Sequence, residues 1–297
     1  MVLETLAATL PNIADERTRV FVYVDDDDEA TKLALSTAKF PAFKGKVFGV
    51  VRPRPLTIAE KWNWMAEEKA DAYLVMVDHS SHRTPGFDKV ILEAAGRFDG
   101  APGAILGPKA NMSFHCANAC TRAWVDAVGY IYPPYFPYWF TDHWCEDVVR
   151  MSGLHEVGGL VVDSSKKPTT QELREPGWWA TFFDAARSLR EDDVRKVVGL
   201  PENKPISVAL QRRIDLRNVD SRLINDCVRG NAPGLTKGSK LSLVEERYLR
   251  VKDKAKEMLP GLLARLPEAE RTAYSKVLYP PTHIANIPKA YAAEMRK

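Results

Sequence analysis

The residues best suited to chemistry are acids that stand directly after apolar, strand-like runs. They are Asp25, Asp26, Asp27 and Asp28 after RVFVYV, and Asp78 after AYLVMV. In open α/β sheets, ligands bind in the crevice at the carboxyl ends of the strands. Carboxylates at that edge can hold a divalent cation against a phosphate. The pattern therefore predicts a polar binding site at one edge of a sheet.

Four consecutive carboxylates repel one another, so we expect cations or hydrogen-bond donors to face them. A second interpretation is a helix N-terminus, since 29–38 can be helical and acids are favourable in a first turn. Both interpretations can hold together. The loop RPRP (52–55) presents Arg54 beside Arg52, and guanidinium groups suit phosphate. A solvated turn explains either arginine alone equally well.

The elements that must position these residues alternate between strand and helix. Strands are predicted at 19–24, 46–51, 72–77, 101–106 and 160–162, and helices at 29–38, 88–95, 121–128 and 141–152. The remainder is predicted to be helical, at 178–189, 192–198, 206–213, 241–263 and 268–277. This order predicts an α/β domain over residues 1–167, followed by a basic helical extension over residues 168–297.

The segment YIYPPYFPYWF (130–140) holds seven aromatic residues and three prolines, which excludes an ordinary helix. Its rings could stack on a sugar or a base, or the segment could be a rigid loop that covers the core. After it, Thr141 or Asp142 is predicted to cap a helix that ends before Gly153. We interpret His143 and His155 as packing or surface residues, and His115 and Cys116, which lack the spacing of a metal site, as core residues.

The composition, 45% hydrophobic and 27% charged, is that of a soluble globular protein. We expect a cytoplasmic protein with reduced thiols, because the four cysteines form no CxxC pair and no run has the length of a transmembrane helix. Residues 185–297 hold 23 Lys+Arg and 14 Asp+Glu, a net charge of +9, which leaves −6 for residues 1–184. The basic half either faces an anionic partner or is a solvated helical surface.

Taken together, these segments resemble nucleotide-sugar glycosyltransferases of the GT-A fold, of the family-2-like type. The resemblance covers residues 19–165 and rests on the order and spacing of five segments. These are VYVDDDDE (22–29), KWN (61–63), the strand ending in DHS (78–80), TPGFD (84–88), and the aromatic-to-acid turn at Asp142 with Gly153 at the end of its helix.

The resemblance implies a GT-A-like mixed sheet flanked by helices and a nucleoside-diphosphate-sugar donor, with UDP expected as the nucleotide. It implies donor binding by Tyr23, Asp25, Asp26, Asp27, Asp28, Arg54, Lys61, Asn63 and Asp78. It also implies a Mn²⁺ or Mg²⁺ ion on Asp78 and His79, with Asp163 in place of the family's distal histidine. Asp142 is implied as the base of an inverting hexosyl- or pentosyltransferase, ahead of Glu146 and Asp147. The strand that usually opens the family's sheet is expected to be absent, since the chain begins directly on a helix.

The acceptor is predicted less directly. A basic extension beside an acidic catalytic half suggests DNA, with a hydroxylated or hydroxymethylated pyrimidine as the acceptor of a bacteriophage enzyme. A cell-surface glycan or a lipid-linked acceptor is the alternative. A nucleotidyltransferase would carry a glycine-rich phosphate loop, which the sequence lacks. A non-enzymatic nucleic-acid-binding protein would explain the basic half but not Asp25–Asp28 and Asp78.

Overall fold

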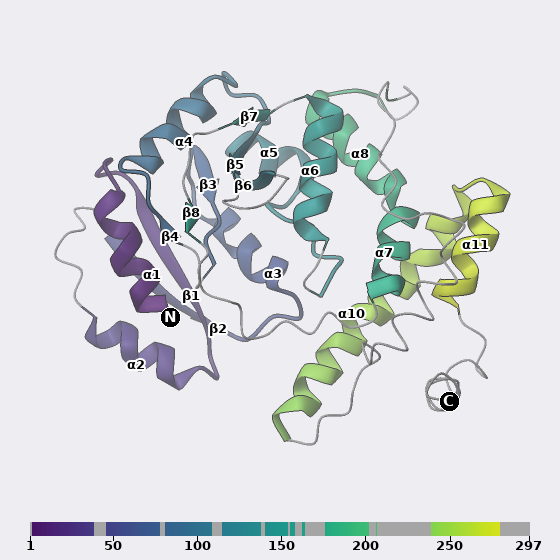
Figure 1. The fold of residues 1–297 in the computed structure, drawn as a ribbon, viewed down its shortest axis with the longest axis horizontal. Helices are drawn as coiled ribbons and strands as arrows, with labels where there is room; N and C mark the ends of the chain where they lie inside the picture. Colours follow the sequence, from purple (N-terminus) through teal and green to yellow (C-terminus); the bar gives the residue numbers. More distant parts are fainter. Residues whose placement is uncertain are drawn as a thin grey trace, which may run out of the picture.

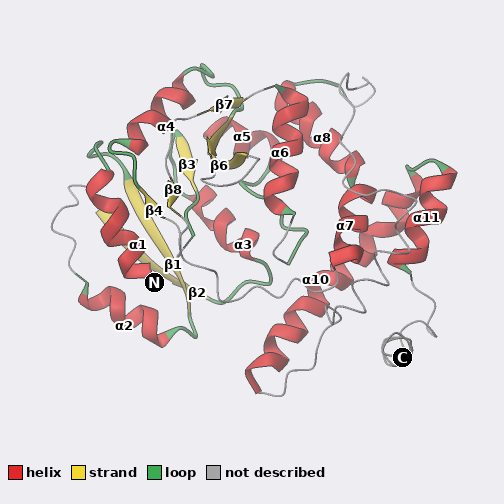
Figure 2. Cartoon of the chain, in the orientation of Figure 1, coloured by secondary structure: helices red, strands yellow, loops and turns green. Residues whose placement is uncertain are grey.

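The computed structural model describes residues 2–38, 46–77, 81–108, 115–137, 140–153, 155–157, 162–163, 176–201, 206 and 239–279. Strands and helices alternate in the first part of the chain, and the described C-terminal part is helical (Figures 1 and 2). The fold therefore belongs to the mixed α/β class that the sequence predicts.

The first unit is a parallel pair of strands covered by helices. Its elements are α1 (Val2–Thr9), the 3₁₀ turn η1 (Leu10–Asn12), β1 (Arg19–Asp25), α2 (Glu29–Thr37) and β2 (Lys46–Arg52). The register runs from Arg19 opposite Lys46 to Asp25 opposite Arg52. The Asp28 side chain accepts a hydrogen bond from the Thr31 amide and so caps α2. The predicted strands and helix of this unit are confirmed.

A four-stranded sheet follows, in the order β3–β6–β5–β7. Its strands are β3 (Ala72–Leu74), β5 (Ala104–Pro108), β6 (His115–Thr121) and β7 (His155–Val157). β6 is antiparallel to β3 and β5, whereas β5 and β7 are parallel. A separate short pair joins β4 (Ser81–His82) to β8 (Val162–Asp163). Among the described residues, β1 pairs only with β2, and β3 pairs only with β6.

Helices cover this sheet, and the aromatic segment 130–140 lies between the last two of them. They are α3 (Ile58–Asn63) with the 3₁₀ turn η2 (Trp64–Glu67), α4 (Phe87–Gly96), α5 (Arg122–Val128) and α6 (Thr141–Ser152). Tyr130, Tyr132 and Phe136 are buried in the main core. For these residues the core-covering interpretation is confirmed, while Tyr138 and Trp139 lie outside the described residues.

α6 has the predicted bounds, Thr141–Ser152, but its N-cap corrects one prediction. The N-cap is Phe140, not Thr141 or Asp142, and no side chain makes a capping hydrogen bond there. Phe140 has φ +74°, a left-handed backbone conformation that is strained for a bulky residue. Its ring packs against Phe136, Phe183 and His143, which holds the backbone in this state. Packing rather than a side-chain cap therefore fixes where this helix begins.

The C-terminal helices share a core with the strands. They are α7 (Pro176–Ala185), α8 (Arg187–Val198), α10 (Ser239–Ala264) and α11 (Glu268–Leu278). One apolar cluster runs from Tyr73 and Trp124 through Trp144 to Phe182 and Leu259, and thus crosses the predicted boundary at residue 167. That boundary and most of the predicted helix 206–213 lie outside the described residues. None of the described helices has both the length and the apolar character required to cross a membrane.

Candidate functional site

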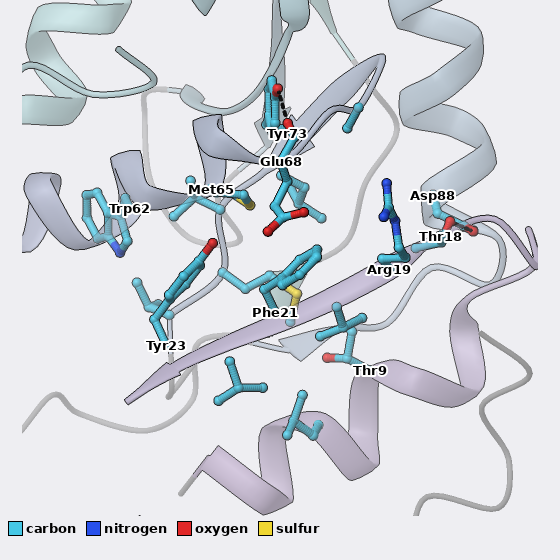
Figure 3. A pocket seen from close by; sticks show the side chains of 18 of the residues that line it. Thr9, Thr18, Arg19, Phe21, Tyr23, Trp62, Met65, Glu68, Tyr73 and Asp88 are labelled. Carbon is cyan, nitrogen blue, oxygen red and sulfur yellow. Dashed lines mark hydrogen bonds between the residues drawn. The ribbon is translucent and has the colours of Figure 1, made fainter. Parts of the chain in front are cut away.

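A cavity of about 1070 Å³ extends between β1 and β3 and is the candidate site. Residues of α1 line one side of it, and residues of α3 and η2 line the other. Phe21 and Tyr23 of β1 point into it opposite Trp62 and Met65 (Figure 3). The middle of the lining is largely apolar, whereas charged side chains gather where the strands begin and where they end.

At the carboxyl end of β1, the buried carboxylate of Asp25 faces two cations. Arg54 Nη1 lies 2.9 Å from Asp25 Oδ2, and Lys61 Nζ lies 2.5 Å from Asp25 Oδ1. Arg54 comes from the proline loop after β2 and Lys61 from α3, so three segments build the cluster. The side chains of Arg54 and Lys61 remain 38% and 19% exposed. An ammonium and a guanidinium together carry eight N–H donors, so both retain donors for an anionic ligand.

The other acids of the cluster have separate roles. Asp27 accepts hydrogen bonds from Arg54, at 2.6 Å from Nη2, which lowers the pKa of Asp27 and raises that of Arg54. The Asp26 amide donates to the Arg52 carbonyl at 2.8 Å, and Asp28 caps α2. Both predictions for the acidic run are therefore confirmed, because some of these acids face a cation and one begins a helix.

The rings of Tyr23 and Trp64 form an aromatic wall beside the cation cluster. Of these two residues, the sequence predicted only Tyr23 as part of the site. Its ring lies 5.6 Å from that of Trp64, and the Arg52 guanidinium lies 5.9 Å and 5.2 Å from the two rings. Arg52 is held by two hydrogen bonds of 2.7 Å to Glu67. Burial raises the pKa of Tyr23 to about 12, so its hydroxyl remains a donor at neutral pH. No spacing in the sequence links Arg52 to Glu67, 15 residues further along.

The side chain of Asn63 binds the protein itself. Its Nδ2 donates to the Tyr132 carbonyl at 2.8 Å, and its Oδ1 accepts from the amides of Ile131 and Tyr132 at 2.9 Å each. Asn63 thus anchors the aromatic segment to the helix that carries Lys61. Direct contact between Asn63 and a nucleotide stays a prediction.

Asp142 lies in the first turn of α6, with its side chain 32% exposed. Its Oδ1 accepts a hydrogen bond from the His143 amide at 2.9 Å and lies 2.9 Å from His143 Nδ1. Among the described residues, Asp142 does not line the cavity. It is connected to the cavity through the aromatic segment, because Tyr132 packs on Trp62 and Tyr135 on Trp144. The strained backbone of Phe140, two residues before it, is the kind of distortion that clusters at functional sites.

The two rival acids on α6 have structural partners. Glu146 and Asp147 are buried and pair with Arg150 and Arg190, respectively. Asp142 is more exposed than either of them. The choice of Asp142 over Glu146 and Asp147 as the base stays a prediction.

The predicted metal ligands are described only in part. Asp78 and His79 lie outside the described residues, and for Asp163 only the backbone is described, in β8 opposite Ser81. Over the described ranges, no group of three His, Cys, Asp or Glu side chains gathers as a metal site. The metal site stays a prediction.

No family model, no curated protein and no solved structure matches the chain. The site must therefore be judged on its own chemistry: a partly exposed pair of cations on a buried carboxylate, at the carboxyl end of a parallel strand pair, beside an aromatic wall. That arrangement suits an anionic ligand that carries a planar ring.

Proposed function

We propose that the chain is a glycosyltransferase with a GT-A-like fold that uses a nucleoside-diphosphate sugar. The observation that carries the proposal is the convergence of Arg54 and Lys61 on buried Asp25, at the carboxyl ends of β1 and β2. The pyrophosphate of the donor would lie against these two cations. Tyr23, Trp64 and the remaining acids would border the base and ribose. The order of motifs in the sequence supports the same reading.

Sugar transfer from such a donor requires two kinds of group in the protein. The departing diphosphate gains negative charge, which preorganised cations stabilise most effectively where they need not move. Asp25 holds Arg54 and Lys61 in place before the donor arrives. The acceptor hydroxyl must lose a proton as it attacks, and Asp142 would accept it in a single displacement with inversion. A Mn²⁺ or Mg²⁺ ion on Asp78, His79 and Asp163 would add further charge stabilisation.

The acceptor that we propose is a hydroxylated or hydroxymethylated pyrimidine in DNA, with a glycan or lipid-linked alcohol as the alternative. The charge asymmetry of the sequence supports an anionic polymer. Two cations on α10 already have acidic neighbours, since Arg250 pairs with Glu246 and Lys256 with Asp253. A salt-sensitive gel shift on hydroxymethylated DNA, set against binding to anionic vesicles, separates the two acceptors.

The donor is tested by calorimetric titration with a panel of UDP-, GDP- and other nucleotide sugars. We expect one of them to bind, and Lys61→Met to weaken that binding about tenfold or more, by loss of a charge-assisted contact of about 1.5–3 kcal/mol. Lys32→Met is the matched control. It removes the same charge from a lysine that contacts Asp26 and Glu29 outside the cavity. If no nucleotide sugar binds below about 1 mM, or if both variants weaken binding equally, the proposal fails.

A further inference from the structure

The cavity lies between the edges of β1 and β3. Within the part of the chain that the structure describes, β1 pairs only with β2 and β3 only with β6, so each has one edge without a described partner strand. The residues that line the cavity include every residue from Arg19 to Asp25 and every residue from Ala72 to Val77. Successive residues of a strand point to opposite faces. A cavity that touches all of them therefore runs along the backbone edges of both strands, not over one face.

The hydrogen bonds of the two sheets indicate which backbone groups face the cavity. The Asp26 amide donates to the Arg52 carbonyl of β2. Because backbone groups alternate in direction along a strand, the amides and carbonyls of Phe21 and Tyr23 point away from β2. The Arg122 amide donates to the Asp71 carbonyl, which directs Ala72 and Leu74 away from β6 by the same rule. The amides and carbonyls of these four residues thus face the cavity from its two sides.

The walls fit a strand that is covered on both faces. Leu6 and Thr9 of α1 line one side, and Trp62 and Met65 line the other. Strands buried on both faces in α/β folds are continuous apolar runs, often rich in β-branched residues. Seven residues of β1 correspond to about 23 Å of extended chain, which sets the length of the occupant.

The charges at the beginning of the strands define one end of the occupant. Arg19, the first residue of β1, donates to the Lys69 carbonyl at 3.0 Å, so β1 and β3 begin at the same end of the cavity. At this end the Glu68 carboxylate points into the cavity above Phe21 (Figure 3). A cationic residue of the occupant would complement it, while the middle requires uncharged side chains.

We propose that this cavity is a slot for one extended strand of a partner polypeptide. The strand would hydrogen-bond with β1 on one side and β3 on the other, and would join the two sheets into one. Its chemistry follows from the walls: about six uncharged, largely β-branched residues without proline, with a lysine or arginine near Glu68. The slot and the proposed nucleotide site belong to one cavity: the nucleotide would use side chains at its carboxyl end, such as those of Arg54 and Lys61, whereas the strand would use the backbone edges of β1 and β3.

The test is residue-resolved amide hydrogen exchange, measured by NMR on the full chain. The probe is an acetylated, amidated peptide of sequence KTVIVTVK, added at 1 mM or tethered to the amino terminus by a flexible linker. A tether raises its effective concentration to the millimolar range, and Val2 already lines the cavity. We expect exchange at Phe21, Tyr23, Ala72 and Leu74 to slow at least tenfold. Val22 and Tyr73, whose amides face β2 and β6, should not change.

The control is the same peptide with alternate residues N-methylated, which removes the donors of one edge. It should give no protection at one of the two strands. The proposal is overturned if the four amides are already protected without peptide, or if the methylated peptide protects both edges equally. It is also overturned if neither the free nor the tethered strand slows their exchange. None of these outcomes alters the nucleotide titrations, so the two proposals fail separately.

Discussion

Replacing Arg190 by leucine is expected to destabilise the whole fold, because Arg190 neutralises a buried acid between α6 and α8. Arg190 Nε lies 3.2 Å from Asp147 Oδ2, and the two side chains are only 1% and 4% exposed. The guanidinium also lies 3.8 Å from the ring of Phe183 and 5.1 Å from that of Trp144. The substitution would leave the Asp147 carboxylate in the core without this cation.

The size of the effect follows from burial. Removing one partner of a buried ion pair costs about 3–5 kcal/mol, mainly because the remaining charge stays desolvated. Loss of the cation–π contacts adds to this, and the packing of leucine offsets part of it. Because a domain is stable by only about 5–15 kcal/mol, the variant loses a large fraction of its stability. Replacing both Asp147 and Arg190 by leucine removes both charges, and should cost less than about 1 kcal/mol.

Urea unfolding followed by tryptophan fluorescence measures these differences. The core holds Trp124 and Trp144 from the first predicted domain and Trp178 and Trp179 from the second, so the signal reports on both. We expect a single transition that shifts as a whole in Arg190→Leu and recovers in the double variant. A loss below about 1 kcal/mol, or a double variant as unstable as the single one, would refute the reasoning. Two separate transitions would show that the halves unfold independently.

Three further predictions concern activity and pH. Asp142→Asn should lower transfer activity about 100-fold or more with little change in melting temperature, and retained activity would exclude Asp142 as the base. Burial lowers the pKa of His82 to about 4, so as pH falls from 6.5 to 4 the unfolded state binds the proton first. Folding stability should therefore decline by about 3 kcal/mol over that range, and a His82→Gln variant should lack this part of the decline in acid urea titrations. Exhaustive chelation should abolish transfer and added Mn²⁺ should restore it, and activity that survives chelation would remove the metal.

Local signals predicted the first unit well. The Val-rich run of β1, the capping position of Asp28 and the run of β2 are each encoded within a few neighbouring residues. The Arg54 and Lys61 contacts with Asp25 were not predicted as a cluster, although each residue was a candidate. These contacts span 29 and 36 residues and depend on how three elements pack. Hydrophobic periodicity in the sequence does not predict such packing.

Other features were beyond local rules. The start of α6 at Thr141 was predicted, but its N-cap is Phe140, held by packing, and not Thr141 or Asp142. The predicted helix 178–189 is interrupted at Ala186, where α7 ends and α8 begins, without a glycine or proline to signal it. Asn63 was predicted to bind a ligand from its motif position. The structure uses its amide to hold Ile131 and Tyr132, a role that depends on the fold around it.

The two proposals meet on β1, which carries Asp25 at its carboxyl end and borders the slot along its length. Among the described strands β1 pairs with β2 alone, and a strand with one ladder of hydrogen bonds opens more readily than a strand with two neighbours. An inserted strand would hold Asp25, and through it Arg54 and Lys61, in the arrangement that the diphosphate needs. By linkage, a peptide that tightens nucleotide binding must itself bind more tightly when the nucleotide is present, by the same factor. Titrating the nucleotide with and without the KTVIVTVK peptide measures that factor. A factor of one would mean that peptide binding in the slot and nucleotide binding at the cation pair are not energetically coupled, although both use β1.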